Sequence, residues 1–194
     1  MAILSIPVTG ESFSDAEKIR DFLRPFGIWY ENWPTAGKGL KQASSDNEIL
    51  SAYSEEIETL KLRASFVTAD VINVNPDTEG LEAMLAKFSK EHTHSEDELR
   101  FCIEGRGIFH INPQSSAVFS IEMEAGDLIN VPAGTRHWFN LCAEKSIRVI
   151  RLFEDSTGWT PHYLENGVDS QYETLCFSEL KIKSDDVRTS VVKP

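Results

Sequence analysis

Residues 92–105, HTHSEDELRFCIEG, and residues 126–140, GDLINVPAGTRHWFN, contain three of the five histidines of this chain and decide its predicted fold. In an extended strand, side chains two residues apart point to the same face, so the imidazoles of His92 and His94 can approach one metal ion. Along a straight strand Glu98 would lie roughly 20 Å from His92, whereas the ligands of one transition ion lie about 2 Å from it. The chain must therefore turn at the polar triplet 95–97, which returns Glu98 to the two histidines.

A fourth ligand is predicted at His137, because it follows the strand GDLINV and a Pro and Gly turn that directs it inward. Three neutral imidazoles and one carboxylate suit iron, nickel, zinc, manganese or copper better than calcium or magnesium. An octahedral ion with these ligands keeps two positions open for a chelating substrate, whereas a structural zinc site is normally closed by its protein ligands. The alternative, a solvated polar loop EHTHSEDE, is disfavoured by the presence of Glu98, Arg100 and the later segment PAGTRH.

The segments around these stretches predict a mainly β protein with peripheral helices. From Arg100 to about Phe153, short apolar runs are broken by Gly and Pro, which is typical of an antiparallel barrel or sandwich. Helices and strands are expected to alternate before that region. The predicted elements are a strand at Ala2 to Val8, a helix capped by Ser14 and ended by Gly27, a helix after Asp46 with Ile49, Leu50, Tyr53, Ile57 and Leu60 on one stripe, a strand at Val67 to Val74, and a helix from about Thr78 to Phe88.

Composition and charge exclude several classes of protein. A chain of 194 residues is long enough for one well-buried core, and its formal charge of −12 argues against nucleic acid or an anionic membrane as the main partner. No apolar run approaches the roughly 20 residues that span a bilayer, and no basic, apolar leader is visible, so we expect a soluble cytoplasmic protein. Cys102, Cys142 and Cys176 are odd in number and include no CxxC pair, so we expect reduced, buried thiols.

The two quoted stretches also resemble the two signatures of cupins. The pattern departs at Ala86, where a Gly is often found, and at Asn140, which lies one residue early, but neither change touches a predicted ligand. Together, the segments KFSKEHTHSEDELRFCIEGRG, VPAGTRHWF and IRLFEDSTGW resemble the acireductone dioxygenase family over about the middle and later two thirds of the chain. This resemblance implies a cupin barrel, which is a double-stranded β-helix or jelly roll.

Residues 1–194 are accordingly expected to form a single cupin domain. We expect a mixed α/β decoration over about residues 1–65, with helices that cap one mouth of the barrel, and the barrel itself over about residues 66–178. The last residues, about 180–194, lose aromatic content and are expected to form a loose tail.

The resemblance implies a specific reaction in methionine salvage. Members of the family cleave the enediol 1,2-dihydroxy-5-(methylthio)pent-1-en-3-one, acireductone, with O₂. The resemblance implies one Fe²⁺ or Ni²⁺ per chain, and the ion sets the products. The iron form releases formate and 4-methylthio-2-oxobutanoate, whereas the nickel form releases formate, CO and 3-(methylthio)propanoate. A monomer with small-molecule partners alone is also implied.

Two arginines are candidates for holding the substrate. An enediol must lose its protons to chelate a metal ion, so a fixed cation beside the ion is required. Arg100 lies two residues after Glu98 and shares its face of the strand, and the resemblance assigns this role to it. Arg151 alternates with apolar neighbours and is the second candidate. Ordinary salt bridges are the alternative for both, with a neighbour such as Glu96 in the case of Arg100.

Other residues are predicted around the ion. The resemblance places Phe88, Phe139 and Trp159 beside the apolar methylthio tail, although each is as often ordinary core. Glu91 and Asp97 flank ligands, where they can accept hydrogen bonds that orient the imidazoles or remain solvated turn residues.

The remaining histidines, His110 and His162, lack partners at ligand spacing, so we expect neither to bind the ion. Two further functions stay open at this stage. Another metal cupin enzyme, such as a sugar-phosphate isomerase or a different dioxygenase, would keep the four ligands and ignore acireductone. A non-catalytic cupin would bind a small molecule without consuming oxygen.

Overall fold

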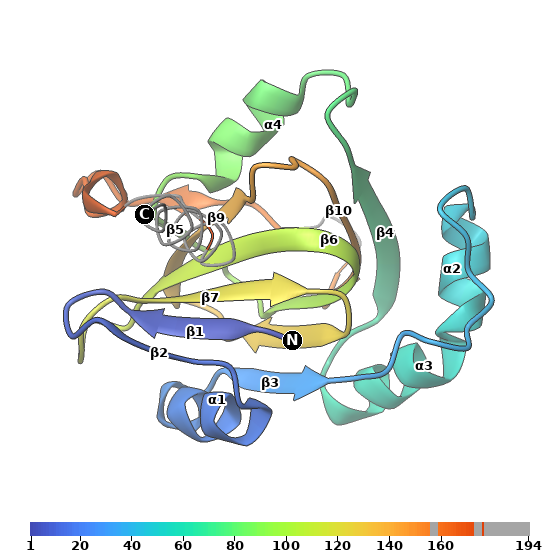
Figure 1. The fold of residues 1–194 in the computed structure, drawn as a ribbon, viewed down its shortest axis with the longest axis horizontal. Helices are drawn as coiled ribbons and strands as arrows, with labels where there is room; N and C mark the ends of the chain where they lie inside the picture. Colours follow the sequence, from blue (N-terminus) through green and yellow to red (C-terminus); the bar gives the residue numbers. More distant parts are fainter. Residues whose placement is uncertain (156–158, 173–175, 177–194) are drawn as a thin grey trace, which may run out of the picture.

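The described part of the chain, residues 1–155, 159–172 and 176 of a computed structural model, contains eleven strands in two sheets that share one strand (Figure 1). The strands are β1 (Ile3–Ile6), β2 (Glu11–Phe13), β3 (Trp29–Asn32), β4 (Thr68–Val74), β5 (His92–Thr93), β6 (Glu98–Asn112), β7 (Phe119–Glu124), β8 (Asp127–Val131), β9 (Arg136–Leu141), β10 (Ile147–Phe153) and β11 (His162–Tyr163). The shared strand is β6, which pairs with β8 and β10 through its first half and with β7 and β9 through its second half. This arrangement is that of a jelly roll and confirms the predicted fold class.

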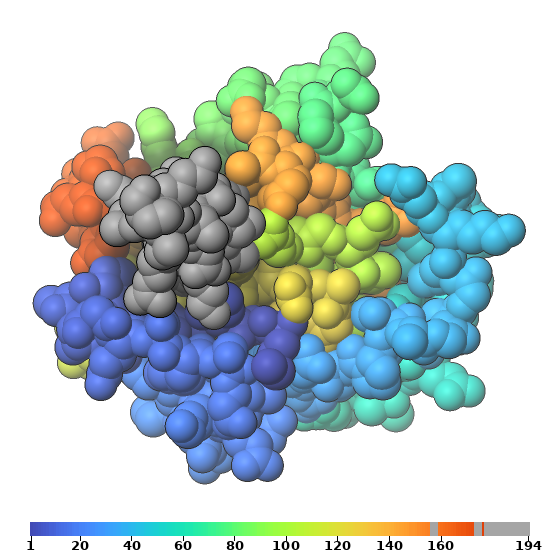
Figure 2. Space-filling view, in the orientation of Figure 1, coloured from blue at the N-terminus to red at the C-terminus, as the bar shows by residue number. Residues whose placement is uncertain are grey.

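The first sheet has the order β11-β5-β9-β6-β7-β1-β2, and the second contains β4, β10, β6, β8 and β3. All of these pairings are antiparallel. The N-terminal residues therefore extend both sheets, because β1 pairs with β7 and β3 pairs with β8. In the space-filling view they form a continuous surface, coloured blue to cyan, along the lower and right-hand sides (Figure 2).

Gly105 marks the point where β6 passes from one sheet to the other. Its φ is +79°, and a Cβ at this position would collide with the backbone of Ser146. Just before it, at Ile103, the pairing with β10 shifts register between Arg148 and Val149. Such a bulge moves the following residues by one position relative to the sheet faces. Cys102 before it and Phe109 after it consequently belong to the same core between the sheets, although seven residues, an odd number, separate them.

The helices lie around this barrel. They are α1 (Ala16–Leu23), α2 (Asp46–Ala52), α3 (Ser54–Arg63) and α4 (Leu81–Phe88), with short 3-10 turns at Arg24–Phe26 and Asp169–Gln171. Three details differ from the predictions. The N-cap of α1 is Asp15, whose carboxylate accepts from the Lys18 amide, and not Ser14. The helix predicted after Asp46 is divided at Tyr53, which leaves the helical conformation, and the helix predicted from Thr78 begins at Leu81.

Helices α2 and α3 cover the outer face of the second sheet. Their buried residues Ile49 and Leu60 pack in one cluster with Leu99 and Ile150, which alternate with the inward-facing residues of β6 and β10. The expectation that the N-terminal helices cap a mouth of the barrel therefore does not hold for α2 and α3. A helix with an apolar stripe buries more apolar surface against a whole sheet face than against the mouth of a barrel.

The cysteines also differ from expectation. Cys142 and Cys176 form a disulfide with a Cα–Cα distance of 5.6 Å, and Cys102 is a buried free thiol. The spacing of 34 residues gave no indication of this pair, because only the folded chain brings the two cysteines together. The predicted loose tail, residues 180–194, lies outside the described residues. None of the described helices has the length and apolar composition needed to cross a membrane.

Candidate metal centre

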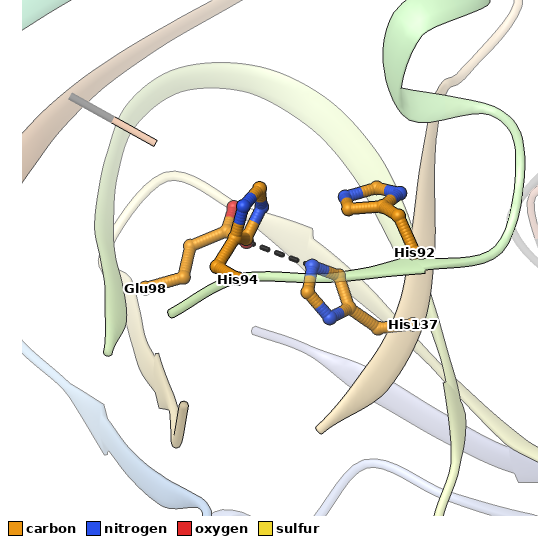
Figure 3. A group of neighbouring side chains, drawn as sticks. All are labelled: His92, His94, Glu98 and His137. Carbon is orange, nitrogen blue, oxygen red and sulfur yellow. Dashed lines mark hydrogen bonds and ion pairs between the residues drawn. The ribbon is translucent and has the colours of Figure 1, made fainter. Parts of the chain in front are cut away.

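Three histidines and one glutamate converge inside the barrel (Figure 3). His92 lies on β5, His94 follows that strand, Glu98 begins β6, and His137 lies on β9 directly opposite His92. All four side chains are buried, with at most 3% of each residue exposed. One donor atom from each lies within 4.8 Å of the others. The structure thus brings together the four residues that the sequence predicts as metal ligands.

The bend at residues 95–97 returns Glu98 to the histidines, and Asp97 holds it in place. Its two carboxylate oxygens accept hydrogen bonds from the Ala133 amide at 2.9 Å and from Asn130 Nδ2 at 2.8 Å. These contacts tie the bend to the turn that precedes His137 on β9. The backbone amide of Gly134 also donates to the His94 carbonyl at 2.9 Å. The bend at residues 95–97 and the turn before β9 therefore hold each other, which fixes Glu98 and His94 relative to His137.

Backbone carbonyls orient all three imidazoles. The Nδ1 atoms of His92, His94 and His137 lie 2.6, 3.0 and 2.8 Å from the carbonyl oxygens of Lys90, Thr160 and Thr135. A carbonyl oxygen can only accept, so Nδ1 is the protonated nitrogen of each ring and Nε2 carries the lone pair. The three Nε2 lone pairs are consequently available to a common ligand.

The Nε2 atoms of His94 and His137 face the same oxygen of Glu98. His137 Nε2 lies 2.8 Å from Glu98 Oε2, and His94 Nε2 lies 3.2 Å from it. His94 Nε2 is buried and, within the described chain, lacks a hydrogen bond of acceptable geometry despite that short distance. A carboxylate and neutral imidazole lone pairs are all acceptors, so their convergence requires a cation between them. A divalent transition ion fits this donor set.

Burial and charge keep the donors in their ligating forms. Burial lowers the pKa of His92 to about 4, and the neighbouring His137 acts in the same direction, so the His92 ring is neutral at pH 7. Burial opposes ionisation of Glu98, but the neighbouring Arg100 guanidinium outweighs it and holds the pKa of that carboxyl well below its usual range. Glu98 is therefore an anion and the His92 ring is neutral before any ion binds.

Two arginines lie next to the donors, of which Arg100 is buried and Arg151 is partly exposed. Arg100 Nε donates to Glu98 Oε1 at 2.5 Å, so its carboxylate partner is the predicted ligand and not Glu96. Arg151 lies directly opposite Arg100 on β10, and Asp70 on β4 binds it through two hydrogen bonds of 2.9 and 2.6 Å. Asp70 thereby balances the second cation.

An apolar pocket begins at these arginines. Met84, Leu85 and Phe88 of α4 face it from one side, and its other walls come from the inner faces of the sheets; the remaining lining residues are Ile72, Val74, Arg100, Phe139, Leu141, Ile147, Val149 and Arg151. Phe139 has room because Gly107 faces it, where a Cβ would collide with the phenyl ring. The pocket can hold a short apolar tail while the arginines hold a charged end.

Comparison with known proteins agrees with this site. Residues 34–161 match the model of the ARD/ARD' family. The chain is 42% identical to the acireductone dioxygenase of Picosynechococcus sp. over 165 residues, which is 85% of this chain and 93% of that protein. It is 37% identical to the acireductone dioxygenase of Methylococcus capsulatus over 180 residues, 90% of this chain and 96% of the relative. The chain belongs to the acireductone dioxygenase family.

A solved structure of the family shows the same fold. The acireductone dioxygenase of Bacillus anthracis, which has a cadmium ion in its active centre, superimposes with a TM-score of 0.76 at 34% identity, over 84% of this chain and 98% of that one. The resemblance of this sequence to the acireductone dioxygenase family is thus confirmed.

Other predicted residues of this family member occupy different positions around the site. Trp159 donates its indole N–H to the Asp97 carbonyl at 3.1 Å. The centre of its ring lies 6.0 Å from that of His94 and 5.4 Å from the guanidinium carbon of Arg100. It therefore lies beside the donors, whereas Phe88 and Phe139 line the apolar pocket.

Glu91 and Asp97 do not supply the predicted contacts to the imidazoles. Glu91 is buried and accepts hydrogen bonds from Asn112 and Asn166, and Asp97 holds the bend described above. The carbonyls that orient the imidazoles are missed by sequence reasoning, because a backbone group leaves no mark in the residue types. Asp70 is also missed, although a lone acidic residue inside the β-branched strand TADVINV is a usable signal.

The two remaining histidines lie away from the donor group. His110 is buried on the outer face of β6, where its ring stacks on Trp138 at 4.8 Å and Ser120 Oγ lies 2.8 Å from its Nδ1. His162 is exposed on β11. Neither residue is part of the metal-ligating group found among the described residues.

Proposed function

We propose that this chain is an acireductone dioxygenase, a metal-dependent enzyme that cleaves acireductone with O₂. The observation that carries the proposal is the convergence of four buried acceptors, from His92, His94, Glu98 and His137, next to the buried cation of Arg100. The relatives named above carry this activity in their names, and one of them holds a cadmium ion in its active centre.

The four donors are proposed to bind one Fe²⁺ or Ni²⁺ per chain. Imidazole nitrogens and a single carboxylate favour such ions over calcium or magnesium. When bound, the ion would supply Lewis acidity for a chelating substrate. The carbonyls behind the imidazoles keep the lone pairs of their Nε2 atoms directed at one point, which strengthens binding by avoiding rearrangement.

Arg100 and Arg151 are proposed to hold the charged end of the substrate. Their guanidinium groups favour the deprotonated enediol and lower the pKa of its hydroxyl groups. Asp70 holds Arg151 in place. Arg100 is the cation nearest the donors, because its carboxylate partner, Glu98, is itself one of the proposed metal ligands. Removal of water from the pocket strengthens both interactions.

The apolar wall is proposed to hold the methylthio tail. Phe88 and Phe139 lie in the pocket beside both arginines, and the Trp159 ring lies 5.4 Å from each guanidinium. A tail in this pocket orients the enediol toward the donors and excludes solvent. Glu91 and Asp97 act indirectly in this scheme, since their contacts hold the loops that carry the ligands.

We further propose a cytoplasmic monomer that serves methionine salvage. The iron form would yield formate and 4-methylthio-2-oxobutanoate, and the nickel form formate, CO and 3-(methylthio)propanoate. Residues 1–194 would act as one catalytic unit, because strands from the N-terminal residues complete both sheets.

The test is anaerobic reconstitution of the metal-free chain with either ion, followed by admission of O₂ over acireductone. Formate, keto acid and CO are assayed separately. Metal-dependent oxygen consumption with ion-specific products is expected. Stoichiometric metal binding without oxygen consumption with either ion would overturn the proposal.

A further inference from the structure

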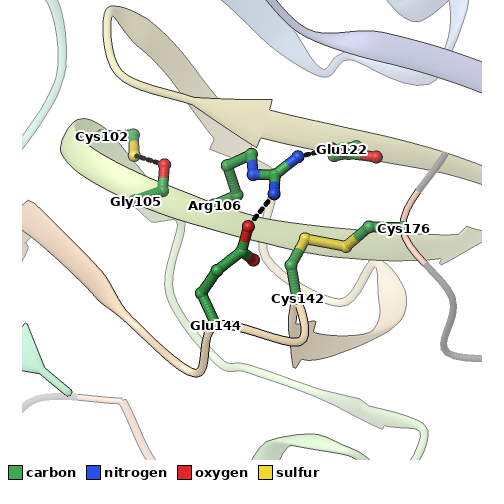
Figure 4. The surroundings of a disulfide bond; sticks show 7 residues. All are labelled: Cys102, Gly105, Arg106, Glu122, Cys142, Glu144 and Cys176. Atoms are coloured by element: carbon green, nitrogen blue, oxygen red, sulfur yellow. Dashed lines mark hydrogen bonds and ion pairs between the residues drawn. A yellow bond between two sulfur atoms is a disulfide. The ribbon is translucent and has the colours of Figure 1, made fainter. Parts of the chain in front are cut away.

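The disulfide between Cys142 and Cys176 (Figure 4) lies outside the barrel. It fastens a segment that begins at the metal centre, beside His94. Both cysteines are buried, with 2% and 0% exposure, and they pack against Ile108 of β6. Cys142 follows β9, the strand that carries His137. The described part of the segment comprises residues 159–172 and 176, which we call the closing segment.

The first half of the closing segment contacts the candidate ligands and their neighbours. The Thr160 carbonyl lies 3.0 Å from His94 Nδ1. β11 pairs with β5, which places Tyr163 opposite His92. The amide of Leu164 then donates to the Glu91 carbonyl at 3.0 Å. One of the three imidazoles therefore depends on this segment for its orientation, and a second lies on a strand that the segment holds.

The second half of the closing segment lies on the outer face of β9. Tyr172 packs against Trp138 with ring centres 5.7 Å apart, and Cys176 is bonded to Cys142. Trp138 and Cys142 share one face of the strand by alternation, whereas His137 faces the donors. The disulfide is thus a covalent anchor for a segment whose other end contacts His94.

We propose that Cys142 and Cys176 form a reversible redox site that controls how tightly the metal centre holds its ion. The inference rests on the proposed function, because it concerns the proposed metal ligands. In the oxidised protein the anchor keeps the Thr160 carbonyl against His94. In the reduced protein the closing segment separates from β9 more often, and the His94 ring loses its fixed orientation.

The co-reactant is a dithiol. One of its thiolates attacks a sulfur of the disulfide and forms a mixed disulfide, which releases one cysteine as a thiolate. The second thiol of the reductant then displaces the other cysteine. Two electrons pass to the protein, the reductant leaves as a cyclic disulfide, and both cysteines take up protons. The reverse exchange with an oxidised dithiol restores the anchor.

The test compares the full-length chain in its two redox states. Metal-free protein is oxidised with diamide or reduced with a phosphine, freed of reagent under anaerobic conditions and titrated with Co²⁺ by absorbance. Reduction is expected to weaken Co²⁺ binding at least about tenfold, as loss of an outer contact to a ligand does. The double variant C142S/C176S should bind like the reduced protein under both conditions. The variant C102S should respond to redox state like the unaltered chain, because Cys102 is the free cysteine.

Hydrogen exchange provides the second measurement. The Leu164 amide should exchange faster in the reduced protein, since its bond to Glu91 opens with the segment. Equal Co²⁺ affinity in the two redox states of the unaltered chain would overturn the proposal even if the double variant fails to fold. The readout does not use acireductone, so failure of the proposed reaction would be seen separately as absent oxygen consumption by protein that binds metal.

Discussion

The two faces of strand β9 show opposite solutions to burying polar groups. On the inner face, His137 Nε2 is 2.8 Å from a carboxylate oxygen that cannot donate to it, so the group is satisfied only with a cation present. On the outer face, Trp138 stacks on His110 and Ser120 Oγ lies 2.8 Å from its Nδ1, so that only one nitrogen, Nε2, is buried without a hydrogen-bond partner among the described residues. The difference indicates that burial alone does not mark a functional histidine. Unsatisfied acceptors directed at one point do so.

The largest expected effect comes from removing the metal-ligand candidate on the inner face of β9. His137→Ala removes one of four donors and should reduce oxygen consumption at least about 1000-fold, because the chemistry depends on the bound ion. Metal content measured by mass spectrometry should fall with it. Full metal content with normal turnover would exclude His137 as a ligand.

A smaller loss is expected when the charge beside the donors is removed. Arg100→Ala should lower kcat/KM about 100- to 1000-fold, which is the usual effect of removing one donor to a developing anion. Metal content should remain near that of the unaltered chain, and Arg100→Lys should restore part of the activity. Unchanged kcat/KM in Arg100→Ala would contradict the proposed role in holding the enediolate.

The buried His110, which packs on the outer face of β9, predicts that the free energy of unfolding depends on pH. Burial lowers the pKa of His110 to about 4, whereas an unfolded histidine has a pKa of about 6.5. The unfolded chain therefore binds the extra proton first, and stability present above pH 6.5 should be lost as the pH falls toward 4. The loss is about 3 kcal/mol by linkage. Urea unfolding of metal-free protein would measure it, and the variant His110→Phe should lose this part of the slope. An identical slope in both proteins would refute the assignment.

The smallest effect is expected at Asp70. Asp70→Asn keeps the shape of the side chain but removes the charge that fixes Arg151, so KM should rise about tenfold with a smaller change in kcat. Steady-state kinetics of enzyme whose metal site is fully occupied would measure this change. A fall in kcat alone, with KM constant, would mean that Asp70 does not act through substrate binding.

Several features followed from short-range pattern. Alternation along a strand brought His92 and His94 to one face and placed Arg100 on the face of Glu98, and the polar triplet 95–97 required a turn. These predictions depend only on backbone geometry over a few residues, so they need no knowledge of the rest of the chain. The fold class and the family resemblance also followed from a few contiguous segments, and the structure and the comparisons with known proteins confirmed both. Iron or nickel as the ion, the monomer and the cytoplasmic location stay predictions.

Tertiary structure decided the remainder. Asp70 and Arg151 are 81 residues apart, and Cys142 and Cys176 are 34 apart, so neither pair is marked by spacing. The expectation of reduced, buried thiols failed for Cys142 and Cys176 for that reason, whereas Cys102 is a buried free thiol as expected. The bulge at Ile103 reverses which residues of β6 face inward, and no periodic pattern predicts such a reversal. The sequence by itself determined the four donor residues that the structure brings together, since that choice depends on residue type and local geometry. Only the packed sheets determined what orients them, because carbonyls, counterions and the disulfide reach the site through contacts distant in the chain.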